Sequence, residues 1–194
     1  MRKILLASLL ATAFAAPAMA QDSAKGPFTG PRVEAIVGWD QVKGDGAKSD
    51  DVMYGVAAGY DVQAGGAVIG GEVEYSDSDN RACDGGAKTV ANPRICLKAG
   101  RDLYVGGRVG TVVGNGSTLL YAKAGYTNAD AKFTANDGTD EVTLDKAHLD
   151  GVRVGAGVEH KFGANTYVKA EYRYSNYEQG LERHQALAGV GFRF

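Results

Sequence analysis

Eight segments of the chain carry apolar residues at every second position, and this alternation limits the possible folds more than any other feature. Successive side chains of a β-strand point to opposite faces, so a period of two predicts a strand with one apolar and one polar face. We expect strands at residues 32–41, 51–62, 67–76, 97–112, 118–127, 149–161, 166–175 and 185–194.

The connections between these strands alternate in length, and the abundance of glycine (28 residues, against 4 prolines) suits strands joined by tight turns. Three short turns are expected at residues 63–66, 114–117 and 163–165. Four longer polar loops are expected at residues 43–50, 77–95, 128–148 and 176–184. The pattern predicts an all-β fold, an eight-stranded antiparallel up-and-down transmembrane β-barrel with both termini on the periplasmic side. A soluble lipocalin-like barrel or sandwich, with the apolar face inside, is the alternative.

Aromatic residues on the apolar faces favour the membrane arrangement over the soluble one. They fall near the two ends of the strands, as expected for rings at the two membrane interfaces. About ten tilted residues per strand span roughly 25 Å, which matches a thin hydrocarbon layer. The predicted external girdle is Trp39, Tyr54, Tyr75, Tyr126 and Tyr174, and the predicted periplasmic girdle is Tyr60, Phe192 and Phe194.

The opposite faces alternate glycine with long charged residues, which predicts a narrow lumen filled by paired charges. The expected lumen network has acidic members Glu34, Glu72, Glu74, Asp102, Glu159 and Glu171, and basic members Arg32, Arg108, Lys123, Arg153, Lys169, Arg173 and Arg193. Such a lumen is either a closed polar core or a narrow pore for water and small solutes.

The first twenty residues have the features of a secretory signal peptide. Arg2 and Lys3 precede an apolar stretch, and Ala18-Met19-Ala20 fits a small-x-small cleavage site. We expect a signal peptide at residues 1–20, a periplasmic lead-in at residues 21–30 and the barrel domain at residues 31–194. Cleavage would lower the 21 basic residues to 19 against 23 acidic ones, a net charge of −4, which argues against a nucleic-acid partner.

The chain has two cysteines, Cys83 and Cys96, both within one predicted external loop. Export to an oxidising compartment makes a disulfide between them the expected state, with two free thiols as the alternative.

Three segments resemble the OmpA-like, porin-family outer-membrane β-barrel domain. They are residues 157–162 (GVEHKF), residues 167–174 (YVKAEYRY) and the ending at residues 189–194 (GVGFRF), and residues 121–127 (YAKAGYT) resemble the family's fifth strand. The resemblance extends from about Pro31 to Phe194. It implies that Phe194 is part of a signal read by the barrel-assembly machinery. We expect no peptidoglycan-binding domain after Phe194, so the resemblance does not imply a tether to the cell wall.

Other chemistry has weaker support. Ser175, His184 and Glu178 could be arranged as in a lipid A-modifying enzyme, but no spacing supports a triad. Acidic clusters at residues 77–80 and 136–141 lack the spacing of a calcium-binding EF-hand loop. Residues 44–49 lack the order of a phosphate-binding loop and are expected to form a flexible hairpin loop.

We therefore expect no enzymatic activity, no cofactor and no metal. The expected role is membrane integrity or surface contacts through the polar loops, and the alternatives are a small porin and a lipid-modifying enzyme. The expected partners are outer-membrane lipid, lipopolysaccharide and, during biogenesis, the assembly machinery. The expected state is a monomer in the outer membrane.

Overall fold

The computed structural model describes residues 26–44, 47–78, 81–83, 86–87, 89, 94–136 and 141–194. The predicted signal peptide and the first part of the predicted lead-in lie outside these residues. The elements are β1 (Gly30–Gly44), β2 (Ala47–Ala64), β3 (Ala67–Ser78), β4 (Arg81–Cys83), β5 (Arg94–Val113), β6 (Thr118–Asn136), β7 (Glu141–Lys161), β8 (Thr166–Tyr177), the 3-10 helix η1 (Glu178–Gly180) and β9 (Glu182–Arg193).

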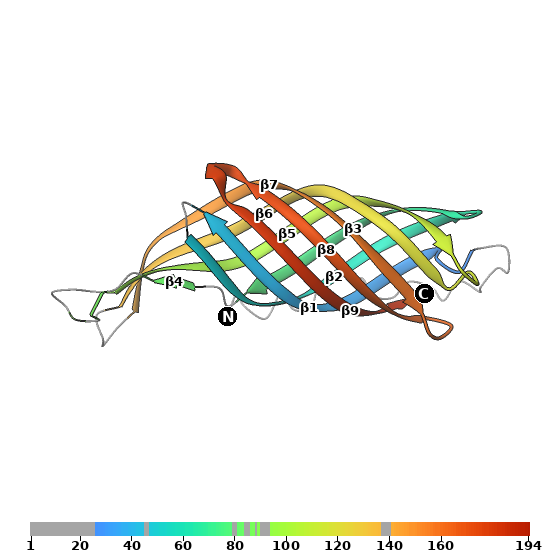
Figure 1. Ribbon diagram of the computed structural model, residues 1–194, viewed down its shortest axis with the longest axis horizontal. Coiled ribbons are helices and arrows are strands. Elements are labelled where there is room, and N and C mark those ends of the chain that lie inside the picture. The colour runs from blue at the N-terminus through green and yellow to red at the C-terminus, as the bar shows by residue number, and fades with distance from the viewer. Residues whose placement is uncertain are drawn as a thin grey trace, which may run out of the picture.

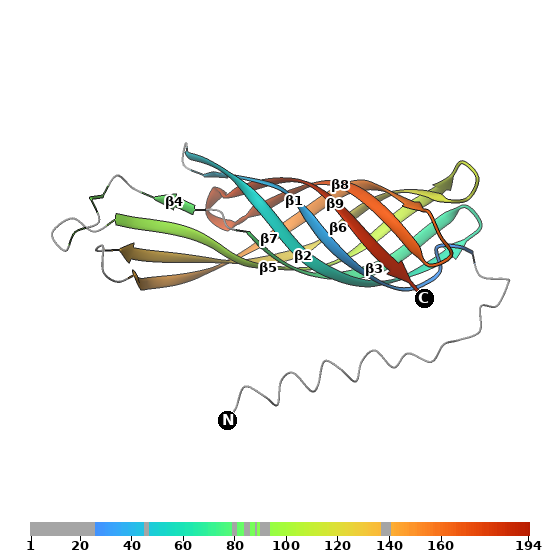
Figure 2. The ribbon, with the colours of Figure 1, turned by 90° about the horizontal axis from the view of Figure 1, so that it is seen from below.

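The strands close into one antiparallel barrel (Figures 1 and 2). Each long strand pairs with its neighbours in sequence, β1 pairs with β9, and β3 pairs with β5. The short β4 adds only to the edge of β5 and leaves eight strands in the barrel wall. The eight-stranded antiparallel barrel expected from the alternation is confirmed. No helix in the described part of the chain is long and apolar enough to cross a membrane.

The short turns at one end of the barrel follow from glycines in the left-handed region of backbone space. Gly65 has a φ of +61° between β2 and β3, and Gly114 and Gly116 have φ values of +64° and +80° between β5 and β6. Side chains rarely adopt these angles, whereas glycine does so without steric penalty. The expected short turns therefore lie together at the end of the barrel that carries the C-terminus (Figure 1).

The expectation of a long polar loop at residues 128–148 was wrong. β6 continues to Asn136 and β7 begins at Glu141, with pairs such as Asp130↔His148 between them. Within β6, apolar residues at 129, 131, 133 and 135 alternate with polar residues, so the period of two continues through residues 128–136. The high proportion of polar residues favoured a loop, but a backbone ladder needs no strongly apolar face, because its hydrogen bonds join main-chain groups.

Three other expected loops are also shorter than predicted. β1 reaches Gly44 and β2 starts at Ala47, so most of residues 44–49 extend these two strands. The loop at residues 77–95 contains β4 and the start of β5, and residues 176–184 contain η1 and the start of β9. The backbone ladders therefore run beyond the segments that the sequence analysis assigned to strands.

Candidate functional site

Every second residue of the barrel wall projects inward, and the charged ones fill the lumen. Among the described residues, eight carboxylates and eight cationic groups are buried there, each at most 5% exposed, so these buried charges balance. Charges taken out of water need partners at close range. The acidic groups are Glu34, Asp40, Asp61, Glu72, Glu74, Asp102, Glu159 and Glu171, and the basic groups are Arg32, Arg108, Lys123, Arg153, Lys169, Arg173, Arg183 and Arg193.

Near the short turns, two arginines and two carboxylates form a closed ring, called here the lower ring. Arg108 Nη2 lies 2.5 Å from Asp61 Oδ2 and 3.1 Å from Glu159 Oε2. Arg193 closes the ring, with Nη1 2.6 Å from the same Asp61 oxygen and Nη2 2.8 Å from Glu159 Oε1. Arg32 adds a third cation, with its Nε 3.0 Å from Asp61 Oδ2.

In the middle of the lumen, Lys123 lies among three carboxylates. Its Nζ is 2.6 Å from Glu72 Oε1 and 3.0 Å from Glu171 Oε1. Lys169 of β8 forms an ion pair with Glu34 of β1. Further pairs of this layer include Lys123–Glu74, Arg173–Glu74 and Arg32–Glu72.

Toward the long-loop end, Asp102 of β5 accepts hydrogen bonds from four other strands, including one of 2.6 Å from the Thr127 hydroxyl of β6. It pairs with Arg153, lies 2.9 Å from Arg183 Nη1 and accepts a hydrogen bond of 2.8 Å from the Tyr177 hydroxyl. Arg183 also binds Asp40, with Nη2 2.5 Å from Oδ2. Because these partners come from β1, β5, β6, β7, β8 and β9, the network ties opposite walls of the barrel together.

Lumen tyrosines occupy the space above glycines of neighbouring positions. A Cβ atom at Gly106 would lie 2.1 Å from the Tyr104 hydroxyl, and one at Gly191 would lie 2.2 Å from the Tyr167 ring. The Tyr104 ring in turn lies 4.6 Å from Lys123 Nζ, within cation–π range. Glycine is therefore required here for aromatic rings as well as for the charged side chains that the sequence suggested.

The structure places every predicted lumen residue inside the barrel, within the network of buried charges. Sequence reasoning missed Asp40, Asp61 and Arg183. Asp40 and Asp61 have the same strand parity as the predicted lumen residues, which was the available signal. Arg183 fell in an expected loop, so its parity could not be assigned before β9 was known to start at Glu182.

The predicted girdle residues project from the outer wall, opposite to the buried charges. Trp39 is 54% exposed, and the others are exposed or partly exposed, as expected for side chains that meet lipid. The outward residues between them are aliphatic, among them Val37, Val56, Val73, Val105 and Val154. Phe194 lies beside Phe192, with ring centroids 4.9 Å apart, and its reading by the assembly machinery stays a prediction.

The three residues considered for a catalytic triad do not assemble. Ser175 lies in the lumen and accepts a 2.8 Å hydrogen bond from Arg153 Nε. His184 lies on the outer wall, with Nδ1 2.7 Å from the Tyr172 hydroxyl, and Glu178 is exposed in η1. The barrel wall thus separates the serine from the histidine.

On the long-loop side, β5, β6 and β7 continue well beyond the end of β8 (Figures 1 and 2). The last β7–β8 pair is Gly151↔Tyr177, whereas β6 and β7 stay paired to Asn136↔Glu141. We call residues 94–101, 128–136 and 141–150, together with β4, the extracellular sheet. At about 3.3 Å per residue, it projects roughly 30 Å from the rim.

A polar cluster marks the base of the extracellular sheet. Asp130 accepts a 2.6 Å hydrogen bond from Arg101 Nε and lies 2.6 Å from His148 Nδ1. Partial burial alone would raise the pKa of Asp130, but its hydrogen bonds to Arg101 and His148 outweigh that and lower the pKa below its ordinary value.

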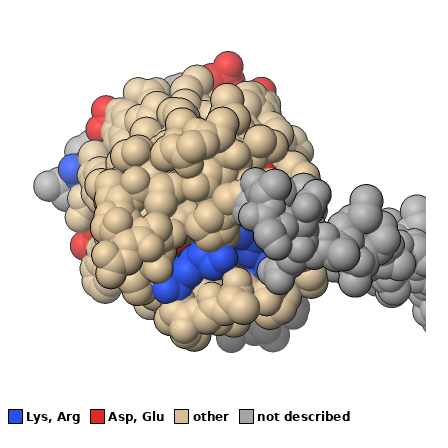
Figure 3. All heavy atoms as spheres, turned by 90° about the vertical axis from the view of Figure 1, so that its right-hand side faces the viewer, with Lys and Arg blue, Asp and Glu red and all other residues tan. Residues whose placement is uncertain are grey.

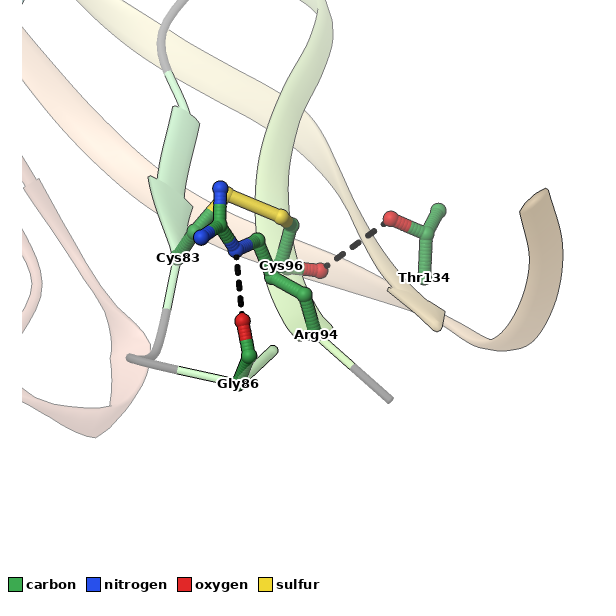
Figure 4. Close-up of a disulfide and its surroundings, with 5 residues drawn as sticks. All are labelled: Cys83, Gly86, Arg94, Cys96 and Thr134. Carbon is green, nitrogen blue, oxygen red and sulfur yellow. Dashed lines mark hydrogen bonds between the residues drawn. A yellow bond between two sulfur atoms is a disulfide. The ribbon is translucent and has the colours of Figure 1, made fainter. Parts of the chain in front are cut away.

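A disulfide between Cys83 and Cys96 fastens β4 to the edge of β5 (Figure 4). The two residues are also direct partners in the β4–β5 ladder. Arg94 Nε donates to the Gly86 carbonyl at 3.1 Å, and the Thr134 hydroxyl donates to the Cys96 carbonyl at 3.5 Å. The disulfide thus fixes the chain that leaves β3 against the extracellular sheet.

The acidic clusters considered for calcium lie partly outside the described residues, at 79–80 and 137–140. Within the described ranges, no group of three or more histidine, cysteine, aspartate or glutamate residues is placed to hold a metal ion.

Comparison with known proteins gives the family. The family described as "Outer membrane protein beta-barrel domain" matches residues 6–194. This chain belongs to that family. It is therefore an integral outer-membrane protein, and its apolar outer wall meets the lipid of that membrane.

Two relatives and two solved barrels resemble this outer-membrane protein. The chain is 31% identical to the 22 kDa outer membrane protein of Rhizobium leguminosarum bv. viciae, over 75% of this chain and 70% of that one. It is 28% identical to the 25 kDa outer-membrane immunogenic protein of Brucella ovis, over 81% and 72%. Ail of Yersinia pestis superposes with a TM-score of 0.58 at 18% identity, over 86% of this chain and 99% of Ail. Neisserial surface protein A gives 0.57 at 14% identity, over 86% and 98%.

Proposed function

We propose that this protein acts at the cell surface, as a closed barrel that holds the extracellular sheet in place for contacts with other polypeptides. The observation that carries the proposal is the continuous pairing of β5, β6 and β7 beyond the rim. A paired sheet holds its shape at a distance from the membrane, which a loop of the same length does not.

The two edges of the extracellular sheet differ. β4 covers the β5 edge and is held there by the disulfide. On the other side, β8 pairs with β7 only from Gly151 onward, so residues 141–150 have no strand beside them on that edge within the described part of the chain. An open edge offers alternating N–H and C=O groups, and an extended polypeptide is the ligand that matches them.

A porin role has less support, because the charges inside the barrel satisfy one another rather than line an open channel. Inside the lumen, the ion pairs around Asp61, Lys123 and Asp102 are all made by side chains in direct contact. Eight-stranded barrels are narrow enough for side chains to fill their interior. We therefore assign the contacts of this protein to its outer surface.

The test compares the full protein with a variant in which a two-residue turn joins Asp130 to His148 and removes the outer part of the β6–β7 hairpin. Both are reconstituted in lipid vesicles and presented to immobilised casein, an extended polypeptide. We expect the full protein to bind and the shortened variant to lose binding, while both keep the heat-dependent gel migration of a folded barrel.

Sucrose octasulfate is a useful second probe, because Ail has been crystallised in complex with this heparin analogue. Asp130 and Asp150 place carboxylates at the base of the sheet, so we expect the sulfated sugar not to compete with casein. Competition by the sulfated sugar, or equal casein binding by both proteins, would contradict the proposal.

A further inference from the structure

The lead-in before β1 enters the mouth of the barrel at the short-turn end. Phe28 is fully buried there, although it precedes the first strand and has no place in the barrel wall. Its ring packs in a cluster with Val68 of β3 and with Leu119 and Tyr121 of β6, and Val112 lies against the same cluster. An aromatic side chain from outside the wall therefore fills the lumen at its periplasmic end.

The backbone around Phe28 is held by side chains from three strands. The Phe28 N–H donates to Gln63 Oε1 at 3.0 Å, and its carbonyl accepts from Arg193 Nη1 at 2.7 Å. Lys161 Nζ donates to the Pro27 carbonyl at 2.7 Å. Gln63, Lys161 and Arg193 belong to β2, β7 and β9, so the segment is fixed from opposite sides of the barrel.

The side chains around residues 26–29, called here the seat of Phe28, contact both ends of this segment closely. The Gln63 N–H donates to the Thr29 hydroxyl at 2.9 Å, and the Thr29 N–H donates to the Gly26 carbonyl at 2.9 Å. A Cβ at Gly26 would lie 2.3 Å from the Gln63 side chain, so any larger residue would push against the side chain that holds the Phe28 N–H. The turn at residues 26–29 thus directs the phenyl ring inward.

Phe28 lies directly against the lower ring. The Arg193 guanidinium carbon is 5.6 Å from the centre of the Phe28 ring, and the same arginine binds Asp61 and Glu159. Figure 3 views this end and shows some basic atoms between stretches of uncharged surface. The lower ring itself is buried, since its four members are each at most 3% exposed. An aromatic ring against it helps to keep water away, and ion pairs are weaker where water reaches them.

We propose that residues 26–29 form a plug that seals the periplasmic mouth of the lumen, with Phe28 as the sealing side chain. The plug separates the lower ring from the periplasm. It joins β2, β7 and β9, and so it also fastens the seam where β1 meets β9. This role is independent of the extracellular sheet, because the two lie at opposite ends of the barrel (Figure 1).

The proposal is tested with a buried reporter thiol beneath the plug. Leu119 is fully buried beside Phe28, so Leu119→Cys places a thiol in the seat, while the disulfide occupies both native cysteines. In lipid vesicles, we expect Leu119→Cys to react slowly with a charged, membrane-impermeant thiol reagent. Adding Phe28→Ala should speed the reaction about tenfold or more, because removing a buried ring leaves a cavity that the reagent can enter.

A matched control reports on the rest of the lumen. Ile36 is 4% exposed and packs with Met53 and Leu187, away from the Phe28 cluster, so Ile36→Cys should stay slow with or without Phe28→Ala. Phe28→Leu, which keeps an apolar side chain in the seat, should leave Leu119→Cys nearly as protected as Phe28 does. Folding of every variant is checked by heat-dependent gel migration.

Equal labelling rates of Leu119→Cys with phenylalanine and with alanine at position 28 would overturn the proposal that residues 26–29 form a plug. So would a parallel rise at Ile36→Cys, because that result would mean general loosening of the barrel. If Phe28→Ala does not fold, a chain that lacks residues 21–28 takes its place, Phe28→Leu remains the protected reference, and the same two results decide.

Discussion

The buried charges give this barrel its most specific residue-level contacts, and Asp61 is a highly connected member of the network. It forms ion pairs with Arg32, Arg108 and Arg193, which belong to three different strands. Removing one member of a buried ionic group leaves the others without compensation, which costs more than the group contributes to stability when intact.

Asp61→Asn should therefore lower the free energy of unfolding by about 3–5 kcal/mol. The measurement is denaturant unfolding in lipid vesicles, followed by the gel shift between folded and unfolded forms. The matched control is Asp50→Asn, on the exposed surface beside Gln41, which should change stability by less than about 0.5 kcal/mol. Similar losses in both variants would mean that the lower ring is not a stability determinant.

Asp130 provides a pH-dependent contact outside the membrane. Its folded-state pKa is below the unfolded value, so its contacts with Arg101 and His148 stabilise the sheet base above the unfolded pKa of about 3.9. That contribution is lost as the pH falls through the lower, folded-state pKa. In a carbon-13 NMR titration of the Asp130 carboxyl, Arg101→Gln should move the midpoint upward. An unchanged midpoint would show that Arg101 does not set this pKa.

At the level of elements, the disulfide holds β4, and the barrel wall does not depend on it. β4 is three residues long and makes three pairs, all with β5, whereas the wall strands pair over ten or more positions. A disulfide that closes a loop of this size stabilises the folded state by about 3 kcal/mol, because it lowers the conformational entropy of the unfolded chain.

Reduction, or the double change Cys83→Ser with Cys96→Ser, should therefore release β4 and leave the barrel folded. Limited proteolysis should then cut between β3 and β5, while the remaining fragment complex keeps its heat-dependent migration. The untreated, oxidised protein is the control and should resist cleavage at these sites. Loss of the barrel's gel shift on reduction would contradict this division between β4 and the wall.

At the level of the whole molecule, the balanced charges and the filled lumen predict a barrel that does not conduct. In planar lipid bilayers, the folded protein should give no discrete conductance steps above those of the bare bilayer and of a heat-unfolded sample. Steady steps that require the folded protein would favour the small-porin alternative over the closed barrel.

Side-chain direction along a strand is a local property with a period of two, so the strands and their two faces could be predicted before the fold was known. That period separated Trp39 and its lipid-facing neighbours from Glu34 and the lumen charges, and it also carried the signal of Asp61. The period continues through residues 128–136, but the high proportion of polar residues there favoured the wrong prediction of a loop.

Which charges meet depends on how the barrel closes. Arg183 binds Asp40, which lies 143 positions away in the sequence, and Arg193 binds Asp61, which lies 132 positions away. Both contacts form because barrel closure and register bring β9 beside β1. The same closure builds the seat of Phe28 from strands on all sides of the lumen, a site that no local pattern near residue 28 contains. Alternation is local and can be read along the chain, whereas pairing across a closed wall depends on register and exists only once the barrel has formed.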